Sequence, residues 1–433
     1  MKRLLHAIAL FSILCYFNPT MLTAQPKSAH PTIGTKSVST DGSLTISLLT
    51  KKQHFASSST ETYDADISSP KSVNIHPNGK KYYVNSIEGA KTVVYESGTN
   101  KKLKTISHKF NSSDSLLWSK PSGLFEFTHY TDNLNTFYGK PVESAFSHHG
   151  RYLWVPYYRR SYDINAQDPS AVAIIDTETD SIIRLMETGP LPKMIAVSSN
   201  NKYVAITHWG NNTVGIIDIS SDKPTDWRYL SCVTVSYKLA LNFSTTTSVN
   251  RDVNSGLCLR GTVFTPDNHY LLVGCMGGNG GIAVIDLTDL SYKGTIYGMM
   301  TNLRHLLISN GYLYLSINKS GYVQRIPLQS FIEAIGTIKD KKARLTGWEN
   351  CKVGSGTRTI EITPDGRYII AACNSSSSIY VVDARTMQVV TSIAADSYPV
   401  GLDISKDGKY IYTTAQGRSG VGGNCVDIFE IKY

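Results

Sequence analysis

The feature that most constrains this chain is a segment of four short apolar runs that recurs along it. One copy, residues 354–396, reads GSGTRTIEITPDGRYIIAACNSSSSIYVVDARTMQVVTSIAAD. Its runs alternate or are β-branched, and turn residues such as Pro-Asp-Gly separate them, a pattern that predicts short strands joined by tight turns. Four antiparallel strands in one repeat form a blade of a β-propeller.

The copies align on a small polar residue that ends the first strand of each. The seven aligned residues are His76, Ser147, Ser198, Thr265, Ser309, Thr363 and Ser405. Most copies continue into a third strand that ends in aspartate, at Asp176, Asp218, Asp286 and Asp383. We therefore predict an all-β fold, a seven-bladed β-propeller of four-stranded antiparallel blades.

Residues 1–24 have the features of a secretory signal peptide: two basic residues, an apolar stretch and small residues at the end. The apolar stretch is too short to span a bilayer. We expect cleavage after Ala24 and export to the periplasm, the cell surface or the medium. Cys15 raises the alternative of a lipoprotein, which Leu14 disfavours because a small residue is wanted before the lipidated cysteine.

The remaining chain divides into a polar segment, residues 25–42, expected to be flexible, and the propeller, residues 43–433. Residues 43–50 alternate like a strand but precede the first copy, whereas the last copy ends after its third strand. The N-terminal strand is therefore predicted to complete the last blade, which closes the ring and removes an exposed edge.

Four insertions interrupt the repeats, at residues 107–138, 159–170, 234–256 and 336–353. Connections between blades, and between the second and third strands of a blade, fall on one face of a propeller, here called the loop-rich face. We expect all four insertions there and only tight turns on the opposite, short-turn face. Binding residues usually lie on such loops over a rigid scaffold.

Five residues before each aligned position, at the start of the innermost strand, most copies carry a cation. The cations are Lys71, Lys193, Arg260, Arg304 and Arg358, and the two remaining positions are Val142 and Val400. Like charges converging on a channel mouth are unfavourable unless an anion or neighbouring carboxylates compensate them. Two interpretations stay open: each cation pairs within the protein, or together they bind an anion such as a carboxylate, catecholate or phosphate.

The ends of the second strands should surround the same mouth. They carry Tyr157, Tyr158, His208, Trp209, Asn318, Asn374 and Gln416. Aromatic faces beside cations suit a planar ligand, so we predict a ligand site from the five cations with Tyr157, Tyr158, His208, Trp209 and Asn374. Ordinary packing is the alternative for each aromatic residue, and for His305 a structural role is expected.

Deeper in the channel, Asn74, Glu361 and Asp403 occupy equivalent positions in three blades and could hold a cation or hydrate the channel. We expect hydration, and hence neither a metal site nor a cofactor.

Six cysteines follow the signal peptide, an even number that permits three disulfides in an exported protein. Cys258 with Cys275 and Cys351 with Cys373 are the favoured pairs, and Cys232 with Cys258 is the competing one. None has the spacing of zinc or thiol-redox motifs.

The formal net charge of +9 gives a mild bias toward anionic partners, although a basic surface kept for solubility explains it equally well. The cations form a ring at one pore and not a stripe that could follow a nucleic-acid groove, so we expect no nucleic-acid partner.

The segment KYYVNS, residues 81–86, resembles the signature of the YVTN-repeat propellers, as do the SPDG-type turns and the recurring VxVID pattern. That superfamily includes surface-layer proteins, seven-bladed lactonases, the d1-haem domain of cytochrome cd1 nitrite reductase and proteins similar to the surface-binding propellers of gut Bacteroidetes. The resemblance implies an exported binding propeller and does not choose its ligand.

We therefore expect a monomeric, non-catalytic protein that binds an anionic small molecule, a glycan or an envelope protein at the channel mouth, with no transmembrane segment. One alternative is a lactonase-like hydrolase in which a carboxylate, a histidine and an arginine act across the mouth, although no acid–base pair is visible in the spacing. The other is a structural component of the cell envelope. Serine-hydrolase, Walker and zinc-protease motifs are absent from the sequence.

Overall fold

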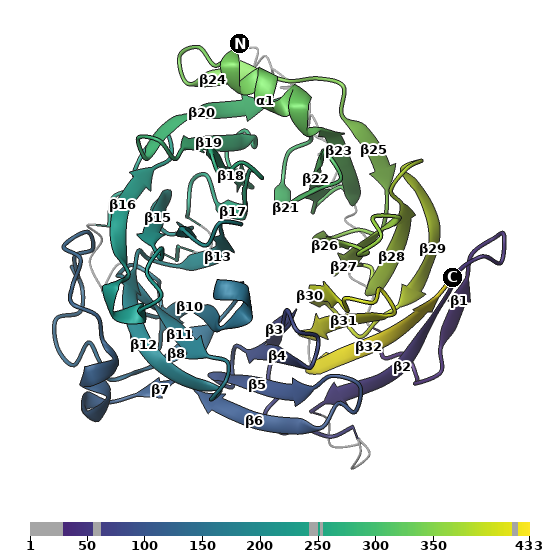
Figure 1. Cartoon of the computed structure of the whole chain (residues 1–433), viewed down its shortest axis with the longest axis horizontal. Coiled ribbons are helices and arrows are strands. Elements are labelled where there is room, and N and C mark those ends of the chain that lie inside the picture. Colours follow the sequence, from purple (N-terminus) through teal and green to yellow (C-terminus); the bar gives the residue numbers. More distant parts are fainter. Residues whose placement is uncertain (1–28, 55–61, 242–249, 252–253, 418–422) are drawn as a thin grey trace, which may run out of the picture.

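The strands form seven sheets arranged in a closed ring, which confirms the seven-bladed β-propeller (Figure 1). The structure is a computed structural model that describes residues 29–54, 62–241, 250–251, 254–417 and 423–433. The predicted signal peptide and Cys15 lie outside the described residues.

Four blades consist of four antiparallel strands each. From the innermost strand outward, they are blade 1, with β3 (Pro70–Ile75), β4 (Lys81–Ser86), β5 (Lys91–Glu96) and β6 (Lys102–Ser107); blade 3, with β13 (Pro192–Val197), β14 (Tyr203–His208), β15 (Thr213–Asp218) and β16 (Arg228–Thr234); blade 5, with β21 (Leu303–Ser309), β22 (Tyr312–Ile317), β23 (Tyr322–Pro327) and β25 (Glu349–Lys352); and blade 6, with β26 (Thr357–Ile362), β27 (Tyr368–Cys373), β28 (Ser378–Asp383) and β29 (Gln388–Ala394).

Blades 2 and 4 carry additional strands. Blade 4 consists of β17 (Leu259–Phe264), β18 (Tyr270–Cys275), β19 (Ile282–Asp286) and β20 (Ser291–Tyr297), with β24 (Lys342–Arg344) parallel to β20. In blade 2, the innermost strand is split into β8 (Phe137–Pro141) and β9 (Ala145–Ser147), which both pair with β10 (Tyr152–Arg160); β11 (Ser170–Asp176) and β12 (Ser181–Thr188) follow, and β7 (Lys109–Phe110) extends β8.

The N-terminal strand closes the ring in blade 7, as predicted. β2 (Thr45–Gln53) pairs antiparallel with β32 (Cys425–Lys432), outside β31 (Tyr410–Ala415) and β30 (Pro399–Ile404). A further strand, β1 (Lys36–Val38), pairs with β2 and lies in the segment that the sequence did not predict to form a strand.

The recurring hydroxyl and aspartate residues close the short turns. The backbone amide of Tyr368 donates to Thr363 Oγ1 at 3.0 Å, which holds the turn between β26 and β27. At the end of β28, Asp383 Oδ1 accepts the backbone amide of Arg385 at 2.9 Å. Local side-chain bonds of this kind stabilise tight turns, which explains why these residue types recur with the blades.

One insertion is not where it was expected. Residues 336–353 are not a connection between blades, because they contain β25, the outer strand of blade 5. The helix α1 (Leu328–Gly336) and β24 therefore lie between the third and fourth strands, a connection of the short-turn side. The helix buries Phe331, Ala334 and Ile335 against the outer part of blades 4 and 5.

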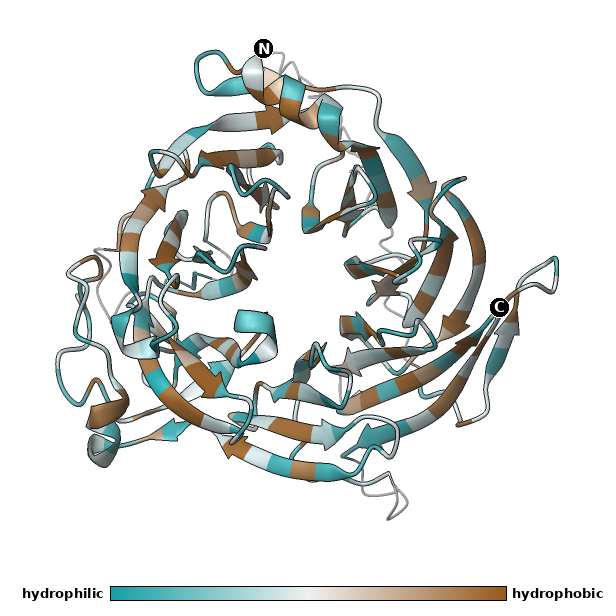
Figure 2. Cartoon of the chain, viewed as in Figure 1, coloured by the Kyte–Doolittle hydropathy of each residue, from teal (hydrophilic) through white to brown (hydrophobic). Residues whose placement is uncertain are grey.

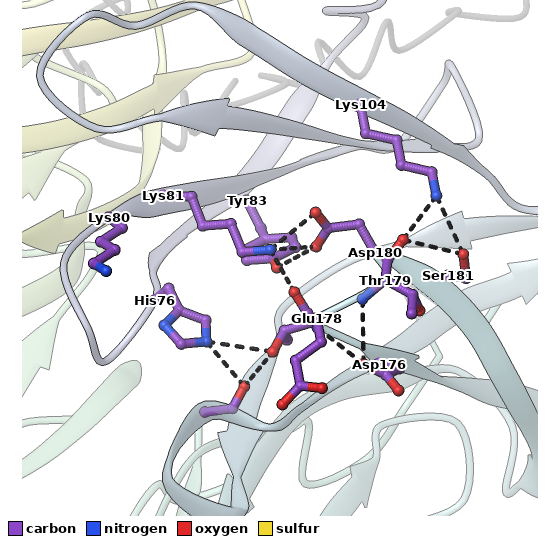
Figure 3. Close-up of polar contacts among 12 residues, drawn as sticks. His76, Lys80, Lys81, Tyr83, Lys104, Asp176, Glu178, Thr179, Asp180 and Ser181 are labelled. Carbon is purple, nitrogen blue, oxygen red and sulfur yellow. Dashed lines mark hydrogen bonds and ion pairs between the residues drawn. The ribbon is translucent and has the colours of Figure 1, made fainter.

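Apolar side chains of neighbouring blades pack against one another. Figure 2 colours the apolar residues of the strands brown. Polar contacts add to this packing on the short-turn side. Between blades 1 and 2, Lys81 and Tyr83 of β4 point at Asp180, with the Tyr83 hydroxyl 2.5 Å from Asp180 Oδ1 (Figure 3). Lys104 donates to the carbonyl of Thr179 at 2.8 Å. The blades are thus joined by both apolar and ionic contacts.

All six cysteines after the signal peptide are free thiols, so the expected disulfides are not formed. Cys351 lies in the outer strand of blade 5, whereas Cys373 lies in the second strand of blade 6. Burial raises the pKa of Cys275 and of Cys373 to about 12, so both thiols stay protonated at neutral pH. No helix in the described part of the chain is long and apolar enough to cross a membrane.

Candidate functional site

A β-bulge at the start of the innermost strand positions each cation of the predicted ring. In β3, for example, Pro70 pairs with Ser86 and Ser72 with Asn85, so Lys71 is the extra residue that has no partner in the ladder. The register shifts in the same way beside Lys193, Arg260, Arg304, Arg358 and Val400. A bulge turns a side chain out of the alternating pattern, and bulges are enriched beside functional sites.

The five cations share one electrostatic environment. Burial lowers the pKa of Lys71 well below its ordinary value, and the nearby charges of Arg358, Arg260 and Arg304 lower it further. Burial and the same neighbours also lower the pKa of Lys193, and burial with Arg260 and Arg358 lowers that of Arg304. Buried like charges that repel one another destabilise the empty site and favour an anion in it.

A carboxylate that the sequence analysis missed lies among these cations. Glu143 Oε1 is 3.0 Å from Lys71 Nζ. Burial by itself would raise the pKa of Glu143, but Lys71, Arg260 and Arg358 bring it below the ordinary value. Glu143 is therefore ionised, and it offsets one of the positive charges.

Glu143 enters the mouth from the break in the innermost strand of blade 2, between β8 and β9. The backbone on both sides is held by blade 1, because Ser72 Oγ donates to the carbonyl of Val142 at 2.7 Å and Asn74 Nδ2 donates to the carbonyl of Ser144 at 3.3 Å. Val142 itself is buried and apolar. The residue after it carries the charge.

Blade 7 also has a valine, Val400, at the position where five blades have a cation. It contributes Tyr398, two residues before that valine, to the mouth. Tyr398 directly precedes β30 and has a φ angle of +65°, a conformation that bulky residues rarely adopt. Its hydroxyl is hydrogen-bonded to Arg358. All seven blades therefore place a polar side chain at the mouth, five from the bulge and two from a neighbouring position. Strain of this kind clusters at functional sites.

Two of the predicted aromatic residues do lie against the cations. Lys193 Nζ is 3.7 Å from the ring centroid of Tyr158 and 5.2 Å from that of Trp209. The guanidinium of Arg260 lies 5.2 Å from the Trp209 ring, which is held by a hydrogen bond from its Nε1 to the carbonyl of Arg251. Cation–π contacts offset part of the cost of burying these charges.

Two other predicted site residues lie elsewhere. Tyr157 and His208 have no exposed surface. The Tyr157 hydroxyl contacts His108 Nδ1 at 2.9 Å, and the His208 ring bonds to Thr213 Oγ1 at 2.8 Å and accepts the Gly189 amide at 3.1 Å. Both side chains belong to the packing between strands because they point between the blades and not into the channel.

Asn374 is also buried, and it packs beside the turn that leads into Arg358. Its backbone amide donates to the carbonyl of Gly356 at 3.0 Å. Asn318 Nδ2 donates to the carbonyl of Thr357 at 3.0 Å, and Gln416 Nε2 to Ser69 Oγ at 3.2 Å. The backbone amide of Asn374 and the side-chain amides of Asn318 and Gln416 therefore stabilise the turns that precede the bulges.

Deeper in the channel, Glu361 and Asp403 interact with each other. Burial raises the pKa of Glu361, and the nearby charge of Asp403 raises it further. Asp403 accepts the backbone amides of Ile75 at 2.6 Å and Ile404 at 2.7 Å. Asn74 is bonded to Ser144 instead, so the three predicted residues do not form one cluster.

Within the described residues, one group has the geometry of a metal site, formed by Asp396, Cys425 and Asp427 in blade 7. Lys51 of β2 already occupies it: its ammonium contacts Asp396 Oδ2 and lies 3.8 Å from Asp427 Oδ1. A buried ammonium takes the place of a cation here, so these residues do not fit an additional metal ion.

Three arginines meet Glu143 and His305 around a cavity of about 30 Å³, which is room for on the order of two water molecules. It is lined by Glu143, Met194, Arg260, Arg304, His305, Arg358 and Thr359. Burial lowers the pKa of His305 to about 4, so its ring is neutral at pH 7. The arrangement can bind a small oxyanion, or place a carboxylate base and an imidazole beside arginine donors.

Comparison with known proteins agrees with the architecture. The family model described as "Lactonase, 7-bladed beta-propeller" matches residues 143–432. No curated protein matches the sequence significantly.

Two solved structures share the fold at low sequence identity. Hydrazine synthase of Kuenenia stuttgartiensis has a TM-score of 0.58 at 13% identity, covering 87% of this chain and 99% of the other. The β-propeller domain of Cps50 (Swd1) from Myceliophteria thermophila has a TM-score of 0.56 at 11% identity, covering 84% and 96%. These likenesses concern the fold alone.

Proposed function

The chain belongs to the family of seven-bladed β-propeller lactonases, and from this premise we propose that it binds a small oxyanion, a carboxylate or phosphate compound, in the ring of cations at its channel mouth. The observation that carries the proposal is the convergence of four buried or half-buried cations, Lys71, Arg260, Arg304 and Arg358, on a single carboxylate, Glu143, with Lys193 beside them. An excess of desolvated positive charge at the mouth of a rigid scaffold is costly for stability and favourable for binding anions.

Arginine side chains make the ring suited to oxyanions in particular. The planar fork of Arg304 or Arg358 matches the paired oxygens of a carboxylate or phosphate, and Lys193 adds a point charge. Tyr158 and Trp209 provide aromatic surface beside these donors. A ligand that combines a small anionic group with a flat or apolar part fits this combination best.

Titration calorimetry with sodium phosphate and with sodium oxalate tests the proposal. We expect both probes to bind the wild-type protein and to lose at least ~10-fold in affinity when Arg304 and Arg358 are both replaced by alanine, because two charge-assisted bonds are removed. The matched control replaces two exposed arginines, Arg228 and Arg344, by alanine and removes the same net charge. Equal losses in both double variants would contradict a specific site.

Native mass spectrometry with absorption spectra of the protein from its own source identifies the physiological ligand. We expect a co-purified anionic small molecule that the Arg304→Ala/Arg358→Ala variant lacks. A clean mass of the protein alone would turn attention to a glycan or protein partner on the loop-rich face.

Lactone hydrolysis is the second candidate, and it is favoured by Glu143 and His305 in one cavity with three arginines. Glu143 would take a proton from water as the water oxygen attacks the lactone carbonyl. The carbonyl oxygen becomes anionic and is stabilised by the arginines; the carbonyl then re-forms as the ring C–O bond breaks, and the leaving oxygen takes the proton that Glu143 holds.

An assay of lactone opening separates the two candidates through Glu143→Gln. If the protein is a lactonase, this variant should lose about 10²-fold or more in kcat, the usual effect of a general base. If the protein only binds, neither form should open aliphatic or sugar lactones above the rate in buffer.

We further propose that the protein is exported and acts as a monomer. The signal-peptide features of residues 1–24 support export. N-terminal sequencing of the secreted protein, with Gln25 expected as the first residue, tests it.

A further inference from the structure

Resting on the proposed anion site, we propose that Glu143 is an internal counter-ion that occupies the ring and is displaced by the ligand, so that the site selects anions with more than one negative charge. Its carboxylate lies 3.0 Å from Lys71 Nζ and shares one cavity with Arg260, Arg304 and Arg358. A ligand oxyanion would need these same donors.

The lining of the cavity supports displacement. The space of about 30 Å³ has room for on the order of two waters, and the Glu143 carboxylate, which is paired with Lys71, lines this space together with the arginines. Rotation of the Glu143 side chain out of the ring would open the place that its carboxylate now fills.

Hydrogen bonds fix the residues on both sides of Glu143, so its side chain can rotate without a change in the backbone. Val142 accepts Ser72 Oγ at 2.7 Å and Asn85 Nδ2 at 2.9 Å through its carbonyl oxygen. On the other side, Ser144 is bonded to Asn74. The Glu143 side chain is 18% exposed, more than that of Lys71 at 6%, so it has a path to solvent.

Charge balance then sets the selectivity. When a monovalent anion replaces the Glu143 carboxylate, the net charge of the ring does not change, and the displaced carboxylate loses its ion-pair partners. A divalent anion adds one negative charge to a ring that still has an excess of positive charge, and this gain increases at the low effective dielectric of a buried site.

The experiment compares phosphate, oxalate and acetate binding to wild type and to Glu143→Gln by titration calorimetry. Oxalate and acetate differ mainly in their number of carboxylates. We expect wild type to bind oxalate and phosphate but acetate at least ~10-fold more weakly, and Glu143→Gln to bind phosphate at least ~10-fold more tightly than wild type. Exposed Glu88→Gln is the control for a general change in net charge, because Glu88 pairs with Lys140 at the surface.

The outcomes separate this inference from the proposed function. If no probe binds to any variant, the anion site itself fails. If wild type binds phosphate and the Arg304→Ala/Arg358→Ala variant does not, but Glu143→Gln binds equally or more weakly, the site stands and the counter-ion role fails. Equal affinity of wild type for acetate and oxalate would also overturn the inference.

Two further measurements apply even if Glu143→Gln does not fold. Glu143→Asp keeps the charge, so its phosphate affinity should stay within about threefold of wild type. A crystal structure with phosphate should show the Lys71–Glu143 ion pair broken and phosphate in contact with the arginines. An intact pair beside bound phosphate in the ring would contradict displacement.

Discussion

At the scale of single residues, the ring depends on how the chain enters each innermost strand. In six of the seven blades, the residue before this strand has a positive φ angle; these residues are Ser69, Leu191, Cys258, Asn302, Gly356 and Tyr398. The bulge follows two residues later. The positive φ angle and the bulge that turns the cation toward the channel mouth therefore form one backbone motif that recurs from blade to blade.

Gly356→Ala tests this motif in blade 6. Gly356 has a φ of +74°, and a Cβ there would lie 2.5 Å from the backbone nitrogen of Ser375. We expect the variant to lose about 2 kcal/mol of unfolding free energy, measured by urea denaturation, because it adds both strain and a clash. Gly336→Ala, where a Cβ meets nothing within 4 Å, is the matched control and should not destabilise the protein. Equal effects of both variants would contradict the argument.

Lys193→Met tests whether the ring sacrifices stability for binding. The methionine keeps the apolar contact with Tyr158 and Trp209 but removes a desolvated like charge. We expect unfolding free energy to stay the same or rise by about 1 kcal/mol, while phosphate affinity falls about tenfold. Loss of stability equal to the loss of binding would show a structural role instead. Exposed Lys202→Met controls for the change of residue type.

At the scale of elements, β2 is the strand that turns an open array of blades into a ring. It pairs with β32 along its length, and its Lys51 is buried between Asp396 and Asp427. An ammonium held by two carboxylates of other segments joins the two ends of the chain. Breaking a buried ion pair by removing one partner costs several kcal/mol, because the other charge is left uncompensated.

Two truncations distinguish the contribution of β2 to ring closure from that of β1. A chain that begins at residue 54 lacks both strands, and we expect it to be cleaved at least ~10-fold faster in limited proteolysis, because β32 becomes an exposed edge. A chain that begins at residue 43 lacks only β1 and should resist protease nearly as well as the whole chain. Equal half-lives for all three chains would refute the role of β2 in closure.

At the scale of the whole molecule, two buried histidines tie stability to pH. Burial lowers the pKa of His108, between β6 and β7, and of His208 in blade 3 from the ordinary 6.5 to about 3. The unfolded chain binds protons below pH 6.5, whereas the folded chain keeps both rings neutral. Their contribution is therefore complete above pH 6.5 and is lost as the pH falls toward 3.

Urea unfolding at pH 7 and pH 5 measures this contribution. Each histidine should account for about 2 kcal/mol of the stability lost between these values. His108→Gln and His208→Gln should each be less stable at pH 7 but show a smaller loss on acidification. His269→Gln, at an exposed position, should keep the full wild-type loss. An unchanged pH dependence in the first two variants would contradict the assignment.

The seven blades, their strand order and the closing strand could be predicted from the sequence because they depend on local patterns. Alternation sets which residues of a strand face the same side, and turn residues such as Thr363 and Asp383 mark the reversals. The cation column was equally accessible, because a repeat places equivalent residues at equivalent positions. Tyr158 and Trp209 followed from the same register.

The rest depended on contacts between segments far apart in the chain. Glu143 reaches the cations because the strand breaks beside it, and Tyr398 because its backbone adopts a strained angle; neither is visible in a pattern of period two. His208 and Tyr157 are buried because neighbouring insertions and blades cover them. Cys351 and Cys373 stay unpaired because they lie in different blades. The sequence by itself thus determined the ring and its cations, whereas the tertiary structure decided which carboxylate and which aromatic groups meet them, because local periodicity sets the side a residue faces but not what packs against it.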